Sequence, residues 1–481
     1  MQLLTIQRVV GALLALFSLT MLPPSFVAWL YHEETFKIFI DAFWVTLVVG
    51  LLVWLPVRRH KADLRLRAGF LIVVLFWFVL GVFGAFPFLY NPHLSVVDAV
   101  FESLSGLTTT GATVIVGIDD LPKSVLYYRQ QLQWLGGMGI IVLAVAVLPM
   151  LGVGGMQLYR AEAPGPVKDN KLTPRLTETA KALWYIYLAL TVICAASFWM
   201  AGMSVFDAIA HSFTTIATGG FSTHDASMGY FESPIIESVA MFFMFASGVN
   251  FSIHFFAWRR VSLCPYHEDS EFRFYAFTLL LVSLLVSYSL LSSDFYGSST
   301  TAIQQALFQT ISFATSTGFT TANFQYWPTF APILLLLVGF IGGCAGSTAG
   351  GLKVIRVLLL IKQGVREIRR LVHPNALFPV KVGSKPVPHD VVDSIWGFFA
   401  LYVMSFCIMS LVLTATGLDL VTSFSSVASC MNNMGPGLGD TAANYAGINS
   451  TAKWVLCAAM LLGRLEIFTL LVLFSPTYWR K

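Results

Sequence analysis

Uncharged apolar stretches, each close to the length of a membrane-spanning helix, are the feature that most limits how this chain can fold. A helix needs about 20 apolar residues to cross the hydrocarbon core of a bilayer. Ten stretches of that order begin near Val9, Phe39, Gly69, Leu132, Ala182, Val239, Phe274, Thr329, Ile395 and Trp454. Only 11% of the 481 residues are charged, whereas soluble domains carry about a quarter. The sequence therefore predicts an all-α polytopic membrane protein.

The placement of Lys and Arg predicts the orientation of these spans, because basic loops stay on the cytoplasmic side. Most of the 29 basic residues lie in alternate connections, with large groups at Arg58–Arg67, Arg160–Lys181 and Lys353–Lys385. We expect these connections and both termini to be cytoplasmic. The opposite connections are mainly acidic, which either concentrates cations at a pore mouth or only reflects the exclusion of basic residues from that side.

A loop sequence that occurs four times on the acidic side further limits the folds that are possible. Each copy has a short apolar segment and then a polar run that reaches a glycine. The four glycines are Gly111, Gly220, Gly318 and Gly435, which are 109, 98 and 117 residues apart. Asp98 and Asp207 each stand 13 residues before the glycine of their own copy. The chain thus repeats a unit of span, short helix, loop and span, predicted at residues 67–158, 159–260, 261–372 and 373–481 after a two-span extension at 1–66.

Four such units in one orientation are expected around a pseudo-fourfold axis along the membrane normal. Backbone carbonyls around a narrow water-filled axis can replace the hydration shell of a cation, and glycine supplies the positive φ that such a loop requires. The short helices would direct their negative C-terminal ends toward the ion. The candidate filter residues are Thr109, Thr110, Gly111, Thr218, Gly219, Gly220, Ser316, Thr317, Gly318, Asn433, Met434 and Gly435. One such loop alone would suggest only helix packing, whereas four copies in register favour a filter.

At this point the chain resembles a known family. The loops Thr-Thr-Thr-Gly111-Ala-Thr, Ala-Thr-Gly-Gly220-Phe-Ser, Ser-Thr-Gly318-Phe-Thr and Asn-Asn-Met-Gly435-Pro-Gly are similar to the pore loops of the Trk/Ktr/HKT superfamily. Together with the extra N-terminal spans and the length, the similarity covers essentially the whole chain and is greatest to the bacterial potassium-uptake members. A Gly at all four filter positions then implies selectivity for K⁺, whereas a Ser at the first position is associated with Na⁺ permeation.

The resemblance also implies a cellular setting. It implies that K⁺ is the transported ion, that the protein lies in the bacterial inner membrane, and that it is a homodimer with one pore per subunit. A TrkA-like cytoplasmic ring that binds nucleotides is the implied regulatory partner. The basic segments Arg160–Lys181 and Lys353–Lys385 could dock that partner, or they could contact anionic membrane lipid.

The stretch Leu334–Lys362 has 29 residues, too many for one upright span, and is rich in glycine near its middle. The spacing fits close helix packing of the GxxxG type, but it equally fits a broken span, because each Gly costs a helix roughly 1 kcal/mol. The residues alone leave both alternatives open. The resemblance implies an intramembrane gating loop, with candidate residues Gly342, Gly343, Gly346, Ser347, Thr348, Gly350 and Gly351.

Arg464 lies near the middle of the last predicted span. A charge at that depth costs at least about 3 kcal/mol and usually faces the protein interior or water. Arg464 is either a buried structural partner of carbonyls or a positive barrier beneath the filter that contacts the glycine-rich loop. Because members of the superfamily carry such an Arg, we favour the barrier.

Other functional classes find little support in the sequence. A Na⁺-coupled or Na⁺-permeable symporter of the same superfamily remains the alternative. An intramembrane enzyme would need a catalytic constellation, and the sequence has no HExxH and no GxSxG motif. It also lacks a P-loop, so no nucleotide is expected to bind this chain, and a net charge of +4 does not suggest a nucleic-acid partner.

Overall fold

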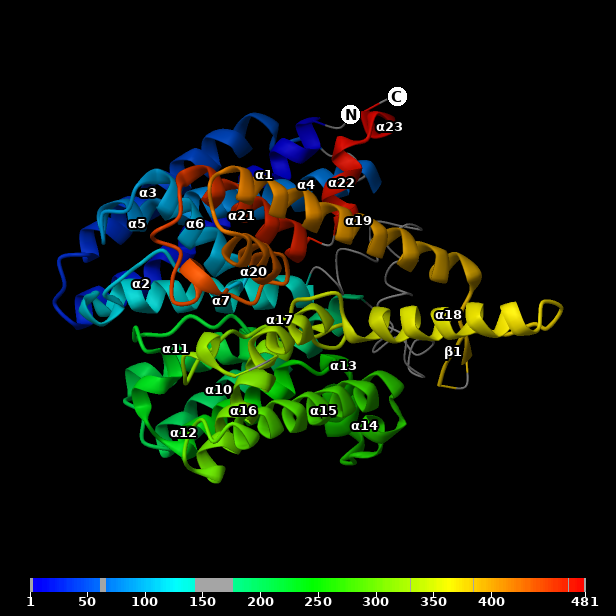
Figure 1. Ribbon diagram of the computed structural model, residues 1–481. Coiled ribbons are helices and arrows are strands. Elements are labelled where there is room, and N and C mark those ends of the chain that lie inside the picture. The colour runs from blue at the N-terminus through cyan, green and yellow to red at the C-terminus, as the bar shows by residue number, and fades with distance from the viewer. Residues whose placement is uncertain are drawn as a thin grey trace.

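The computed structural model describes residues 3–60, 66–142, 176–328, 330–383, 385–465 and 467–479. Within these ranges the chain is almost entirely helical, as predicted (Figure 1). The strands of the described residues are β1 (Lys381–Val382) and β2 (Lys385–Pro386), which pair antiparallel in one short hairpin. The predicted boundary at 158/159 and most of the Arg160–Lys181 segment lie outside the described residues.

The N-terminal extension is a pair of closely packed helical segments. Its helices are α1 (Leu3–Ser18), α2 (Leu22–Leu30) and α3 (Phe36–Trp54). A β-carbon built on Gly11 would lie 2.7 Å from the backbone nitrogen of Trp54, and one on Gly50 would lie 2.6 Å from that of Ala15. Glycine at these two positions therefore lets the backbones of α1 and α3 approach each other, as is common between membrane helices.

Four similar groups of helices follow. The first is α4 (Leu66–Gly84), α5 (Phe86–Tyr90), α6 (Val96–Leu107) and α7 (Lys123–Val142). The second is α10 (Leu176–Met200), α11 (Val205–Ala217), α12 (Pro234–Ser247) and α13 (Phe251–Arg260). The third is α14 (Cys264–Glu268), α15 (Ser270–Ser292), α16 (Ser299–Ala314), α17 (Ala331–Ile341) and α18 (Val354–Val372). The fourth is α19 (His389–Ala415), α20 (Leu420–Met431), α21 (Ser450–Arg464), α22 (Ile467–Leu471) and α23 (Pro476–Trp479). Each group thus contains a long helix and then a short helix, α6, α11, α16 or α20, which we call the inner helices.

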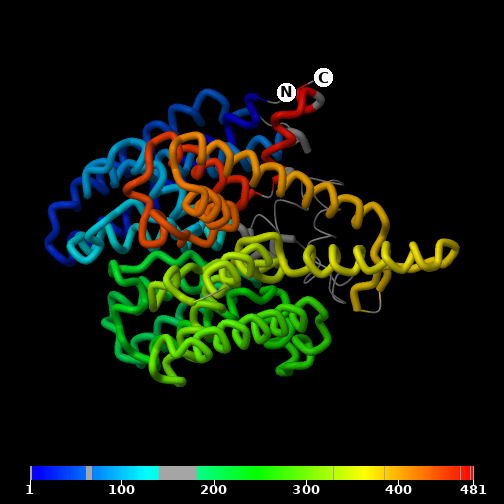
Figure 2. The backbone as a smooth tube through the Cα atoms, viewed as in Figure 1, coloured from blue at the N-terminus to red at the C-terminus, as the bar shows by residue number. Residues whose placement is uncertain are grey.

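The first and last groups lie side by side, although they are far apart in the sequence. In Figure 2 the blue and cyan part of the chain is next to the orange and red part, while the green and yellow part forms the other half of the bundle. One hydrophobic core joins Phe101 and Leu132 of the first group with Phe398 and Met460 of the last. The arrangement therefore closes on itself, as a ring of four repeats requires.

The expectation of ten spans is wrong for two stretches, which are bent or interrupted, while a third is broken at the glycine-rich run, as one of the two alternatives allowed. Six described helical segments are long and apolar enough to cross a membrane, and they match the predicted starts near Val9, Phe39, Gly69, Ala182, Phe274 and Ile395. The stretch near Val239 is a bent pair, because α12 and α13 meet at 97°. The stretch near Thr329 stops being helical after the 11 residues of α17, and that near Trp454 stops after the 15 residues of α21. The stretch near Leu132 continues past Val142 into residues outside the described ranges.

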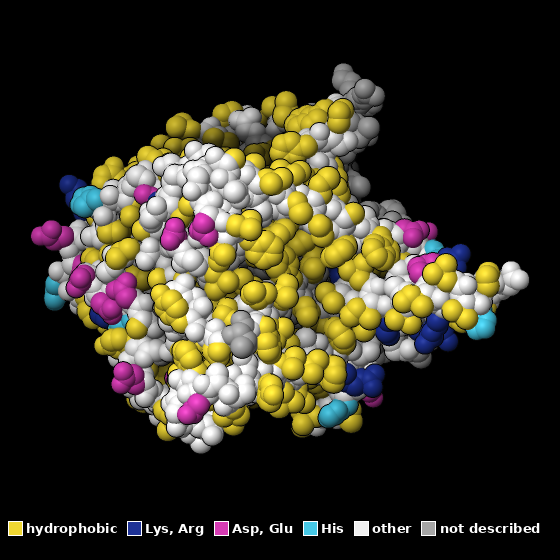
Figure 3. All heavy atoms as spheres, viewed as in Figure 1, with side chains coloured by type: hydrophobic (Ala, Val, Ile, Leu, Met, Phe, Trp, Pro, Cys, Tyr) yellow, Lys and Arg dark blue, Asp and Glu magenta, His cyan; other side chains and the backbone are white. Residues whose placement is uncertain are grey.

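The charged side chains gather at opposite ends of the visible face. In Figure 3 acidic side chains lie mainly at the left, Lys and Arg lie mainly at the right around α18 and the hairpin, and hydrophobic side chains cover the region between them. This distribution is what an apolar bundle with polar ends requires of a membrane protein.

Candidate functional site

The four inner helices end in the same backbone structure. The second residue before each repeat glycine is left-handed, with φ of 53° at Thr109, 51° at Thr218, 53° at Ser316 and 52° at Asn433. The residue after it donates its backbone N–H to the carbonyl five residues earlier, over 2.8 to 2.9 Å in all four copies. This is a Schellman cap, in which the left-handed position is usually glycine. The shared cap turns each chain out of its helix in the same direction.

The repeat glycines themselves form a closed ring. Their φ values are 81° at Gly111, 77° at Gly220, 79° at Gly318 and 98° at Gly435. A β-carbon on each would strike a carbonyl oxygen of the next loop: Gly111 against Gly219 at 2.1 Å, Gly220 against Thr317 at 1.9 Å, Gly318 against Met434 at 1.9 Å, and Gly435 against Thr110 at 2.8 Å. The contacts run from the first loop to the second, third and fourth and back to the first. Both φ and space therefore require glycine here, and the twelve predicted filter residues lie in one ring.

A cavity of about 420 Å³ opens on one side of this ring. We call it the vestibule, and all four repeat glycines line it together with Arg129, His224 and Asp225. No cluster of three His, Cys, Asp or Glu side chains suited to a metal ion occurs in the part of the chain that the structure describes. Neutral backbone and hydroxyl oxygens are thus the ligands on offer in the ring, a set that suits a monovalent cation that has shed its water.

A buried ion pair supports the wall of the vestibule. Arg129 Nε contacts Glu102 Oε1 at 2.9 Å, and neither side chain is exposed. Arg129 also donates to the carbonyl of Ser222, over 3.0 Å, while Glu102 accepts the backbone N–H of Val114 at 2.9 Å. The pair therefore joins the segments that follow the first and second repeat loops, and the sequence analysis did not single out either residue.

The glycine-rich segment is a break in a span. Helix α17 ends before Gly342, whose φ is 71°, and α18 begins at Val354, so residues 342–353 form a non-helical loop. Its backbone N–H at Gly350 donates to the Ser316 hydroxyl of the third repeat loop, and a β-carbon on Gly350 would lie 2.1 Å from the carbonyl oxygen of Asn432. The Thr348 hydroxyl donates to the carbonyl of Ile216 over 3.0 Å. The loop therefore lies against the C-terminal ends of three inner helices.

Arg464 contacts this loop. Its Nη1 donates to the carbonyl of Thr348 over 3.2 Å and its Nη2 to the carbonyl of Gly136 over 3.3 Å. The side chain is buried, and among the described residues no carboxylate lies within ion-pair distance of it. Arg464 thus makes the predicted contact with the glycine-rich loop. It also has the carbonyl partners that a purely structural role requires, so its contacts fit both interpretations.

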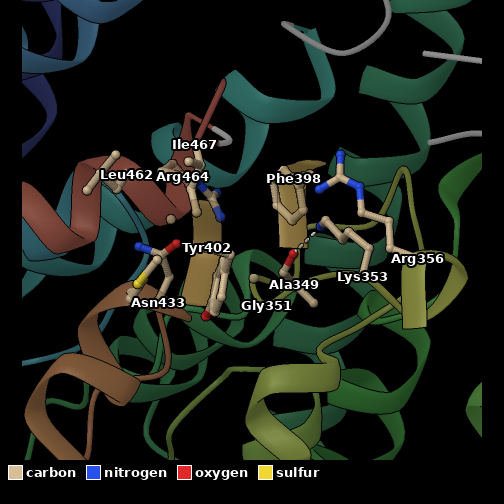
Figure 4. Close-up of a pocket in the computed structure, with 13 residues that line it drawn as sticks. Ala349, Gly351, Lys353, Arg356, Phe398, Tyr402, Asn433, Leu462, Arg464 and Ile467 are labelled. Carbon is tan, nitrogen blue, oxygen red and sulfur yellow. Dashed lines mark hydrogen bonds between the residues drawn. The ribbon is translucent and has the colours of Figure 1, made fainter. Parts of the chain in front are cut away.

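A second, smaller cavity of about 60 Å³ lies beside Arg464 (Figure 4). Gly350, Gly351 and Asn433 line it, and so do Lys353 and Arg356. Figure 4 shows Arg464 and Asn433 on one side of this space and Lys353 and Arg356 on the other. The sequence analysis missed both of these basic residues as site residues, although Lys353 directly follows the glycine run. The cavity thus has a basic lining next to the fourth repeat loop.

The apolar helices define a helical membrane protein, and the family and relatives it matches are transport proteins rather than enzymes. The chain belongs to the TrkH family, described as a cation transport protein, whose family model matches residues 35–481. The family resemblance inferred from the loops is therefore confirmed.

Similar proteins include the Trk system potassium uptake protein TrkH of Vibrio parahaemolyticus, which is 58% identical over 100% of both chains. The protein of the same name from Escherichia coli K12 is 55% identical over 99% of each chain, and TrkG of that strain is 44% identical over 98% of this chain and 97% of its own. The crystal structure of the potassium transporter TrkH from V. parahaemolyticus superposes with a TM-score of 0.93 at 55% sequence identity and covers 100% of both chains.

Proposed function

We propose that this chain is a K⁺-selective, channel-like uptake protein that moves K⁺ into the cytoplasm through the ring of four loops. The closed contact of four left-handed glycines, each against a carbonyl of the next loop, carries the proposal. Such a ring offers carbonyl oxygens in place of the hydration shell of a cation. The potassium uptake named for the relatives supports K⁺ as the transported ion.

The Gly342–Lys353 loop and Arg464 form the proposed gate. The loop touches the ends of three inner helices, so an ion that leaves the ring on that side must pass it. Arg464, Lys353 and Arg356 place positive charge around the small cavity, which opposes the passage of a cation while the loop is in this position. Movement of the loop together with Arg464 would lower that barrier.

The proposed assembly is a homodimer in the bacterial inner membrane, with both termini cytoplasmic and a TrkA-like nucleotide-binding ring as its regulator. The relatives are named as parts of a Trk system, which supports a regulatory partner. Helix α18 extends away from the bundle (Figure 1), and it exposes Ile368 and Leu371 beside basic residues in its last turn. Such a surface fits a protein partner or anionic lipid headgroups. The nucleotide would bind the partner, not this chain.

A Na⁺-coupled or Na⁺-permeable symporter is the second candidate, and one substitution separates the two. Gly111→Ser places a side chain against the Gly219 carbonyl at a left-handed position, so we expect slower Rb⁺ uptake in which Na⁺ competes about tenfold better with Rb⁺. Rb⁺ uptake into proteoliposomes, with and without Na⁺ and a pH gradient, measures both the selectivity and any coupling.

Gly417→Ser is the matched control for this experiment. Gly417 is also left-handed, with φ of 99°, but no atom lies within 4 Å of a β-carbon built on it. Its substitution should leave the Na⁺ competition as in the unmodified protein. Equal Na⁺ competition in Gly111→Ser and Gly417→Ser would refute the filter assignment.

A further inference from the structure

One side chain of α7 holds the second filter loop on both sides of its glycine. Gln133 Nε2 donates to the carbonyl oxygen of Gly219 over 2.6 Å, and Gln133 Oε1 accepts the backbone N–H of Phe221 over 3.0 Å. The first bond fixes the peptide group before Gly220 and the second fixes the peptide group after it. Gln133 is fully buried, so water does not compete for either bond. Neither peptide group of Gly220 can rotate without breaking a hydrogen bond.

The other three loops have no counterpart of this contact. The residues in the position of Gly219 are Thr110, Thr317 and Met434, and among the described residues no donor is recorded for their carbonyl oxygens. The hydrogen bonds around the ring are therefore asymmetric. One of the four carbonyls at this level already accepts a protein N–H, and three keep their lone pairs for other partners.

The sequence of the second loop is adapted to this contact. It alone has glycine directly before its repeat glycine, in Thr218-Gly219-Gly220. A β-carbon on Gly219 would lie 2.4 Å from Cδ of Gln133 and 2.5 Å from its Oε1. Gly219 therefore has no side chain because the amide of Gln133 occupies that space.

We propose that Gln133 is a positioning residue that sets the discrimination between K⁺ and Na⁺ by tying down the Gly219 carbonyl. The inference rests on the proposed function, since it assumes that the ring is the filter. A carbonyl that already accepts a hydrogen bond offers a cation a weaker field, and weak-field oxygens favour the larger, less strongly hydrated ion. A carbonyl that is also fixed in place cannot move inward to the shorter distance that Na⁺ requires. Field strength and cavity size thus both predict that Gln133 favours K⁺.

The test compares two glutamines on the same helix. Gln133→Met keeps the length of the side chain and removes both hydrogen bonds to the filter. Gln131→Met is the control, because Gln131 is also buried and donates an amide bond of the same length, 2.6 Å, but to the carbonyl of Thr20 in the N-terminal extension. We expect Gln133→Met to transport Rb⁺, but with Na⁺ inhibiting the uptake about two- to tenfold more strongly. This is the change expected from loss of the one hydrogen bond to the Gly219 carbonyl. Gln131→Met should keep the unmodified ratio.

A second variant reaches the same contact from the other side. Gly219→Ala drives a methyl group into the Gln133 amide and displaces it, so it should change the Na⁺ competition in the same direction, even if Gln133→Met is poorly folded. A shift in Gly111→Ser without a shift in Gln133→Met or Gly219→Ala would overturn the role of Gln133 and leave the filter standing. The absence of a shift in all three variants would overturn the filter itself.

Discussion

The ring of filter loops and the Gly342–Lys353 loop are both irregular, buried and rich in glycine, but they are held in different ways. The ring repeats one backbone structure four times with different side chains: Thr, Thr, Ser and Asn occupy its first left-handed position. Its geometry follows from the helix caps and from glycines in contact. The Gly342–Lys353 loop occurs once, and single side chains from several helices hold it.

Glu271 is the clearest of these single contacts. It lies in the first turn of the long helix α15 and is almost fully buried, and its Oε1 accepts the backbone N–H of Ala345 at 2.7 Å and that of Ile355 at 3.2 Å. One oxygen thus ties the loop to the start of α18. Ser316 and Arg464 hold the loop further along, near its Gly350 and Thr348. A repeated backbone structure suits a filter that must stay rigid, whereas a few separable contacts suit a segment that must move.

The largest expected effect breaks the ring. Gly318→Ala places a methyl group 1.9 Å from the Met434 carbonyl oxygen at a φ of 79°, so neither the space nor the backbone angle admits it. We expect Rb⁺ uptake to fall by more than about tenfold. At Gly435 the corresponding distance is 2.8 Å, so Gly435→Ala should retain more uptake. Uptake rates at matched protein density in proteoliposomes measure both variants. An equal loss of uptake in the two would contradict the inference that the loops are in closer contact at Gly318 than at Gly435.

The next effect concerns the loop and has the opposite sign. Arg464→Met keeps most of the side-chain volume but removes the charge and the bonds to Thr348 and Gly136, so cation flux should rise by about tenfold for each 1.4 kcal/mol of barrier removed. Arg464→Lys keeps the charge and should stay close to the unmodified protein. Flux of the purified protein without any partner is the measurement, and an unchanged or lower flux in folded Arg464→Met protein would count against the barrier.

A smaller rise in flux should follow when the loop loses its anchor. Glu271→Ala leaves two buried N–H groups without their acceptor, at a cost of about 1–3 kcal/mol, so the loop should open more often and flux should rise several-fold. Glu271→Gln keeps an oxygen in the same place that can accept these N–H groups, so its flux should stay close to that of the unmodified protein. Glu237→Ala removes another buried carboxyl, which accepts from Gln304 in the N-terminal part of α16, whereas the loop lies at the C-terminal end of that helix, so flux should stay unchanged. Identical flux in Glu271→Ala and Glu237→Ala would show that Glu271 does not restrain the loop.

The same contrast explains what could be predicted from the sequence. The candidate filter positions could be predicted because the pattern recurs in register, and the four repeat glycines lie in contact with one another's loops in one ring. Single contacts leave no such pattern. Gln133 and Glu271 each occur once, and the only hint of Gln133 was a group of glutamines, Gln130, Gln131 and Gln133, near the start of a predicted span, where polar residues are costly.

The breaks in the helices also depend on single contacts that leave no pattern in the sequence. The 97° bend between α12 and α13 follows Gly248, where a β-carbon would lie 2.4 Å from the hydroxyl of Tyr275 on another helix. Asn250 then caps α13 by accepting the backbone N–H of Ser252. Hydropathy alone does not record such contacts between helices, so the apolar stretch near Val239 looked like one straight span.

The smallest expected effect concerns the side-chain contacts of His224 at the vestibule. In the vestibule, His224 Nδ1 contacts Asp119 Oδ1 at 2.6 Å and Nε2 lies 3.6 Å from Asp207 Oδ1, while Tyr230 stacks on the imidazole and His211 lies nearby. Partial burial opposes the charged imidazole, but the two carboxylates outweigh it and raise the pKa of His224 above its usual value.

A raised pKa in the folded state gives stability that is complete below the ordinary His pKa, about 6.5, and is lost as the pH rises through the folded value. The melting temperature should therefore fall slightly more between pH 6 and 8.5 in the unmodified protein than in His224→Asn, by roughly one degree. His93→Asn, at an exposed histidine on the connection between α5 and α6, should melt with the pH dependence of the unmodified protein. A His224→Asn profile parallel to that of His93→Asn would mean that the contacts of His224 add no pH-dependent stability.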